Sequence, residues 1–239
     1  MLRKSLIALM ACVLLTGSAG VASPIDGAIS RAGAWLVDNQ NPGGDWGEFG
    51  FTGECLIGLV NAYEVTGNTD YLDAAEGAAT YAVYDEGGYN AGTGTYTDGL
   101  FASASYGLTR LSGVNANPAN NIYRTAVMDD FDGLDPTATI SWYRTSVEDS
   151  YALLDLSRYT VSAFAVDDED KAEWRDGLIQ ALWDLDDSDD APVMALGAAT
   201  WALAQTGGLP SGITVSIHGQ ATTLDELPGM LAGHQMGDG

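Results

Sequence analysis

The sequence predicts an all-α protein in which helical hairpins pack side by side as an α/α toroid or an open arc of one. Apolar residues recur at intervals of three and four through most of the chain, which is the spacing of one helical face. Short polar or glycine-rich connections separate these segments, and no strand-helix alternation of the parallel-sheet type is present. The 239 residues, 46% of them hydrophobic, suffice to bury a core.

The first half of the chain predicts four helices. The first ends at Asn41-Pro42-Gly43-Gly44, a proline and glycine stop signal. Thr52 is expected to cap the second helix, and Asn68 or Thr69 to start the third. The glycines between residues 85 and 94 predict a loop. The expected helices are residues 24–40, 52–66, 68–82 and 97–111.

The second half predicts five more helices and two extended segments. An acidic break is expected over residues 129–136, followed by a short extended piece over 137–143. Ile213, Val215 and Ile217 alternate with polar neighbours, which indicates a strand or extended loop before a final helix over 224–233. The other expected helices are residues 117–128, 146–166, 168–185 and 192–205.

The N-terminus predicts export. Arg3 and Lys4 precede a short apolar run and then a small-residue segment, and the run is too short to span a bilayer. Residues 1–22 are therefore expected to be a secretory signal peptide, which places the mature chain outside the cytoplasm as a secreted, periplasmic or cell-surface protein with no membrane insertion.

The charge of the chain excludes some partners. With 33 acidic residues against 9 Lys and Arg, its formal charge is -24, which opposes binding to nucleic acid or anionic lipid. Cys55 is the only cysteine after the signal, so an intrachain disulfide and a multi-cysteine metal site are excluded. Its apolar helical neighbours predict a buried, inert thiol.

Residues 31–46, RAGAWLVDNQNPGGDW, resemble the QW repeat of squalene cyclases and the wider terpenoid cyclase and protein prenyltransferase superfamily. The resemblance implies a structural motif of Gln40, Gly44 and Trp46, in which glutamine and tryptophan interact and fasten a helix end to the next loop. Residues 227–239 are similar to a second copy that contains Gln235 but lacks the aromatic residue. We therefore expect residues 23–239 to be one toroid domain, incomplete at its C-terminus.

The superfamily resemblance also raises the question of terpene cyclisation. Residues 184–187 match the DxDD motif of class II terpenoid cyclases, in which the middle acid, here Asp186 between Asp184 and Asp187, protonates an alkene. The stretch continues as Ser188-Asp189-Asp190, which is more typical of a solvated acidic run that ends a helix. Terpene cyclisation is therefore the third choice among the functions considered.

A carbohydrate-active enzyme, either a glycosidase or a lyase, is the second functional interpretation. It needs two carboxylates facing each other across a cleft with aromatic rings nearby, and acids next to aromatics occur at several loop-to-helix junctions. Asp98, Glu148 and Asp149 are the preferred catalytic candidates, with Asp45, Asp85 and Glu86 as further acids of this kind. Residues 62–72 are similar to the hairpin turns of six-hairpin glycosidases. Ordinary helix capping explains the same acids.

Calcium binding is another interpretation of the acids, because calcium prefers several carboxylate oxygens in a flexible loop. The candidate ligands are Asp129, Asp130, Asp132 and Asp135, or alternatively Asp184, Asp186 and Asp189. No cofactor is required by any motif found. The leading interpretation is an exported binding or scaffold module for an extracellular protein or glycan, and the sequence leaves open whether the chain is an enzyme.

Overall fold

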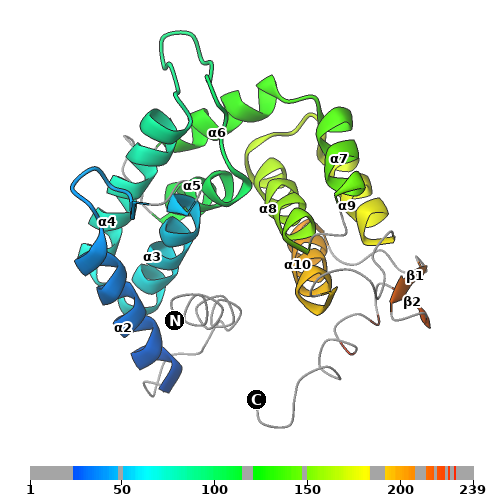
Figure 1. Cartoon of the computed structure of the whole chain (residues 1–239), viewed down its shortest axis with the longest axis horizontal. Helices are drawn as coiled ribbons and strands as arrows, with labels where there is room; N and C mark the ends of the chain where they lie inside the picture. Colours follow the sequence, from blue (N-terminus) through cyan, green and yellow to red (C-terminus); the bar gives the residue numbers. More distant parts are fainter. Residues whose placement is uncertain are drawn as a thin grey trace. The chain divides into compact units, whose positions relative to one another are not determined.

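The computed structural model describes residues 24–47, 51–114, 121–146, 150–183, 192–207, 214–217, 220–223, 226 and 229. These residues are helical apart from their turns and one short β-hairpin (Figure 1), which confirms the all-α prediction. The helices are α2 (Pro24–Asn39), α3 (Thr52–Thr66), α4 (Thr69–Thr80), η2 (Tyr81–Glu86), α5 (Ala102–Val114), α6 (Asn121–Gly133), α7 (Pro136–Thr145), α8 (Ser150–Val166), α9 (Lys171–Trp183) and α10 (Pro192–Gln205).

The chain divides into two compact units, Met1–Asp130 and Phe131–Gly239. We call them unit 1 and unit 2 and describe each by itself. Helix α6 contributes residues to both.

Unit 1 is built around α3, which packs against α2, α4 and α5. Small residues allow these helices to approach closely. A Cβ added at Gly53 of α3 would lie 2.4 Å from the backbone nitrogen of Ala104 in α5, and one added at Gly107 of α5 would lie 2.8 Å from Leu56. The apolar faces between these helices supply the core: Leu36, Leu56, Leu59, Val60, Ala75, Ala78, Ala79, Leu108 and Leu111.

The ends of α2, α3 and α4 agree with the sequence signals in most respects. Gly67 adopts the left-handed conformation that closes α3, and the side chain of Asn68 caps α4 by accepting a hydrogen bond from the Asp70 amide. The predicted cap at Thr52 is wrong. Phe51 occupies the N-cap position, and Thr52 is already inside the helix and fully buried.

Two further differences lie between α4 and α5. The α4 helix continues into a π-helical turn, η2, where the sequence predicted a helix end and a glycine loop. The α5 helix begins at Ala102 rather than at residue 97, because residues 97–101 form a non-helical segment held by contacts to neighbouring elements.

Unit 2 contains α7 to α10 and the β-hairpin. Helix α8 packs against α9 and α10, and α7 packs against α8 and α9. Gly177 of α9 permits the closest approach, since a Cβ there would lie 2.3 Å from the side chain of Ile140 in α7. Rings fill much of the core, with the centroid of Trp174 lying 5.3 Å from that of Phe131 and 5.7 Å from that of Tyr159.

The acidic break and the extended piece predicted between residues 129 and 143 are both wrong. Helix α6 continues through the acidic residues to Gly133 because Asp129 and Asp130 accept hydrogen bonds from Tyr89 and the Leu100 amide instead of ending the helix. Residues 136–145 are helical because Asp135 caps the Ala138 amide and Pro136 occupies the first turn.

The predicted extended segment near residue 215 is confirmed as one strand of a hairpin. Strand β1 (Thr214–Ile217) pairs with β2 (Gln220–Thr223) in an antiparallel register that places Thr214 opposite Thr223. Strand β1 lies against α9.

Candidate functional site

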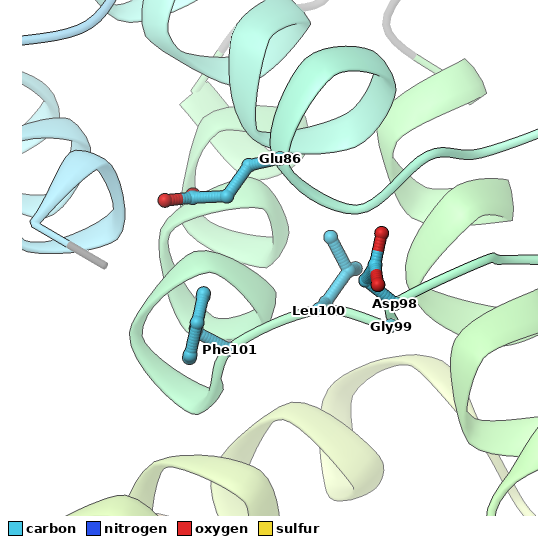
Figure 2. Close-up of a pocket in the computed structure, with 5 residues that line it drawn as sticks. All are labelled: Glu86, Asp98, Gly99, Leu100 and Phe101. Carbon is cyan, nitrogen blue, oxygen red and sulfur yellow. The ribbon is translucent and has the colours of Figure 1, made fainter. Parts of the chain in front are cut away.

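Unit 1 contains a pocket of about 270 Å³ between the end of η2 and the segment that leads into α5 (Figure 2). Two carboxylates and one aromatic ring contribute to its lining. The lining residues are Glu86, Asp98, Gly99, Leu100 and Phe101.

Glu86 reaches the pocket because of the π-helical turn. The backbone N–H of Gly87 donates to the carbonyl of Ala82, five residues earlier, at 3.0 Å. This spacing makes a wider turn than an α-helix has, and such turns are rare and frequently found at functional sites. Glu86 is the last residue of this turn, and only 6% of its surface is exposed. The turn therefore places a carboxylate in a largely buried position.

Residues 98–101 form the opposite side, which we call the pocket wall. The Asp98 amide donates to the carbonyl of Gly87 at 3.1 Å, and the Leu100 amide donates to Oδ1 of Asp130 at 3.0 Å. Gly99 has a φ of +83°, a conformation that favours glycine. Leu100 is buried, whereas Asp98 is exposed and Phe101 remains 40% exposed. The wall therefore presents a carboxylate and a ring to solvent.

One face of α6 holds the loop that carries this wall. The hydroxyl of Tyr96 donates to the carbonyl of Ala126 at 3.0 Å, and the hydroxyl of Tyr89 donates to Oδ2 of Asp129. The rings of Tyr89 and Tyr96 lie 4.8 Å apart between their centroids. With the Leu100 bond to Asp130, the loop is fastened near its start, middle and end to positions that share one helical face.

Burial dominates the electrostatics behind the wall. It raises the pKa of Asp130 to about 7, although the hydrogen bond from the Leu100 amide favours the charged form. Burial, followed by the hydrogen bond to Asp129, raises the pKa of Tyr89 to about 12. Burial and the charge of Asp130 also raise the pKa of Tyr96. The two tyrosines therefore stay protonated and act as hydrogen-bond donors.

The two pocket carboxylates differ in direction and in surroundings. In Figure 2 the Glu86 side chain extends away from Asp98, and Leu100 is drawn between them. Hydrolysis of a glycosidic bond needs two carboxyl groups that face each other across the scissile bond. A site with one buried and one exposed carboxylate beside a ring is better suited to holding a polar group against an apolar surface.

Asp98 is the only preferred catalytic candidate that the described residues contain. It lines the pocket, and Asp45 lies elsewhere in a turn, where it accepts hydrogen bonds from Asn41 and from the Gly47 amide. Seven other predicted site residues lie outside the described residues: Glu148, Asp149, Asp184, Asp186, Asp187, Asp189 and Gln235.

The four candidate calcium ligands that the structure describes are not gathered at one place. Asp129 binds Tyr89, Asp130 binds the Leu100 amide, and Asp135 caps α7, while Asp132 is exposed. Among the described residues, no three His, Cys, Asp or Glu side chains come together as a metal ion would require. A calcium site at these residues stays a prediction.

Gln40 and Trp46 fasten the end of α2 to the following loop through backbone carbonyls. Gln40 donates to the carbonyls of Gly44 and Ala74, each at 2.9 Å, and the Trp46 indole donates to the carbonyl of Leu36 at 3.0 Å. Among the hydrogen bonds of the described residues, none joins Gln40 to Trp46 directly. Gly44 has a φ of +100°, and a Cβ there would lie 2.3 Å from the carbonyl oxygen of Gly77, so the close contact between loop and α4 requires glycine.

Sequence reasoning missed the role of Phe101 and did not select Glu86. Phe101 fell inside a predicted helix, and only the run Asp98-Gly99 before it signalled a break. Glu86 was one of several acids beside tyrosines, and its selection depends on a π-helical turn that no short motif predicts. Cys55 is partly buried, and burial with the nearby charge of Glu54 raises its pKa to about 12, in keeping with the expected inert thiol.

Comparison of the chain with models of protein families, with curated proteins and with solved structures finds no match. In the part of the chain that the structure describes, no helix has the length and hydropathy needed to cross a bilayer.

Proposed function

We propose that the protein is an exported binding module that holds an extracellular glycan or protein at the pocket of unit 1. The observation that carries this proposal is the meeting of Glu86, Asp98 and Phe101 at one pocket. An exposed ring provides apolar contact area, and carboxylates accept hydrogen bonds from hydroxyl, amide or ammonium groups.

The direction of the carboxylates favours binding over cleavage. Glu86 and Asp98 do not face each other in Figure 2, and Asp98 is exposed, whereas an acid catalyst is usually held in a site that tunes its proton affinity. The excess of acidic residues over Lys and Arg disfavours anionic ligands, so the ligand is expected to be neutral or cationic at the group that enters the pocket.

We further propose an α/α-toroid relationship and export through residues 1–22. The support for the first is the helical packing within each unit and the fastening of α2 by Gln40, Gly44 and Trp46. The support for the second is the pattern of basic, apolar and small residues at the N-terminus. Mass spectrometry of the protein recovered after expression in a secreting host tests export, and an N-terminus other than Ser23 or its neighbours would contradict cleavage there.

The binding proposal is tested with a purified protein that begins at residue 23, applied to arrays of neutral oligosaccharides and of basic and neutral peptides. We expect binding to one class of probe, with Phe101→Ala and Asp98→Asn each reducing it about tenfold or more, as loss of a central contact does.

Two exposed residues outside the pocket lining provide matched controls. Trp35→Ala removes an exposed ring of α2, and Asp38→Asn removes an exposed carboxylate of the same helix. Both are expected to bind like the unmodified protein. Arrays without a single binder, or binding that Phe101→Ala and Trp35→Ala reduce equally, would overturn the proposal.

A carbohydrate-active enzyme is the second candidate, since the pocket does hold two carboxylates and a ring. Release of reducing ends from the array oligosaccharides, abolished by both Glu86→Gln and Asp98→Asn while binding persists, would favour the enzyme. Binding without release favours the module.

A further inference from the structure

Asp130 is buried at a place where its charge is costly. The residue is 5% exposed, and its Oδ2 atom has no hydrogen-bond partner among the described residues. A buried carboxylate with an unsatisfied oxygen destabilises the folded state unless another benefit offsets the cost. The stability of the core therefore does not explain why an acid stands at this position.

The hydrogen bond that the Asp130 side chain makes within the described residues is to the pocket wall. Its Oδ1 atom accepts the Leu100 amide at 3.0 Å, and a Cβ at Gly99 would lie 3.5 Å from the same atom. The neighbouring acid on α6, Asp129, contacts the same loop at Tyr89, which does not line the pocket. The two acids thus bind different parts of the loop, and only Asp130 of the two accepts a hydrogen bond from a residue that lines the pocket.

Backbone hydrogen bonds also hold the two ends of the wall. Its first residue, Asp98, is tied to Gly87, and its last, Phe101, has its carbonyl in the first turn of α5. The Leu100 amide lies between these points. Fixing it sets the path of Gly99, whose left-handed conformation turns the chain so that Asp98 faces solvent.

We infer that Asp130 is a positioning residue, which fixes the pocket wall through the Leu100 amide and so sets the placement of Asp98 and Phe101. This inference rests on the proposed binding function of the pocket. Asp130 does not line the pocket, so it acts on a bound group only through the wall.

The test compares two substitutions of similar size. Asp130→Asn keeps an oxygen that can accept the Leu100 amide, and Asp130→Leu removes the acceptor without leaving a buried charge. Hydrogen exchange of the Leu100 amide, followed by NMR at one fixed pH, is expected to accelerate about tenfold or more in Asp130→Leu, because the buried amide loses its acceptor. In Asp130→Asn the exchange is expected to stay within about threefold, because the side-chain oxygen of Asn still accepts the amide.

Asp129→Ala is the matched control on the same helix. It removes the partner of Tyr89 and is expected to leave Leu100 exchange within about threefold of the unmodified protein, because one hydrogen bond away from the wall is lost. Equal exchange in Asp130→Leu and Asp130→Asn would overturn the inference. If Asp130→Leu does not fold, exchange of the Leu100 amide is measured in the unmodified protein. An exchange rate there as fast as that of an unprotected amide overturns the inference.

The same arrays of neutral oligosaccharides and peptides then separate the two proposals. Faster Leu100 exchange in Asp130→Leu together with weaker array binding, both restored in Asp130→Asn, supports the positioning role in binding. Faster exchange with arrays that bind nothing refutes the binding function and leaves the wall contact established. Unchanged exchange with array binding that depends on Phe101 refutes the role of Asp130 alone.

Discussion

The cores of the two units are filled in different ways. In unit 1 glycines and alanines let backbones meet, as where Gly53 lies on Ser103 and Ala104. In unit 2 the rings of Phe131, Tyr143, Tyr159 and Trp174 pack edge to face, tilted or stacked, with centroids 5.3 to 5.9 Å apart. A core of close backbones should tolerate no added atoms, whereas a core of rings should tolerate no lost ones.

The largest effect is expected from Trp174→Ala in unit 2. Trp174 is 1% exposed and contacts two other rings, so its truncation should lower the free energy of unfolding by about 3 to 5 kcal/mol. Urea denaturation followed by near-ultraviolet circular dichroism measures it. Trp142→Ala, at a residue 61% exposed, is the control and should change the free energy by less than about 1 kcal/mol. Equal losses of unfolding free energy in both variants would mean that the packing of Trp174 against its neighbouring rings does not stabilise unit 2.

Asp130 gives the next largest effect, and its direction depends on pH. Burial raises its pKa to about 7 from 3.8, so between these values the folded state holds a proton that the unfolded state has released. Stability from this group is therefore present below about pH 4 and is lost as pH rises through about 7, by at most about 4 kcal/mol at 1.36 kcal/mol per pH unit.

Asp130→Asn isolates this contribution. The free energy of unfolding should fall less between pH 5 and pH 8 in the variant than in the unmodified protein, because the amide does not titrate. Paired urea titrations at both pH values measure the difference. An identical pH dependence in the two proteins would show that Asp130 is ionised without cost in the folded state.

Glycine substitutions test the backbone contacts of unit 1 and should have the smallest effects. Gly53→Ala places a Cβ 2.4 Å from the Ala104 nitrogen and should cost about 1 to 3 kcal/mol. Gly113→Ala on α5 meets no atom within 4 Å and should stabilise by about 0.5 to 1 kcal/mol. Thermal unfolding of both variants is the measurement. Stabilisation by Gly53→Ala would mean that α3 and α5 separate to admit the methyl group.

The sequence predicted helices well where apolar periodicity and end signals coincide. At α4 the capping Asn68 follows the helix-ending Gly67, and both signals act within a few residues. It failed where an acidic run was taken as a break, since Asp129 and Asp130 are placed by contacts to residues about 30 to 40 positions away, which local propensity does not report.

The candidate site shows the same division. Asp98 was selected because it follows an aromatic segment, and it does line the pocket. Its neighbours in the pocket could not be selected in the same way. Glu86 depends on a π-helical turn, and Phe101 on a helix that begins later than its periodicity suggests, because the Leu100 amide is taken by Asp130 instead of by an earlier carbonyl.

The π-helical turn links the pocket to the length of the chain. Tyr81–Glu86 extend α4 with the wider spacing that results when one amino acid is inserted into an α-helix. Deleting a single residue there would restore ordinary α-helical geometry and rotate Glu86 about 100° around the helix axis. A lineage of such proteins could therefore gain or lose this carboxylate through one codon.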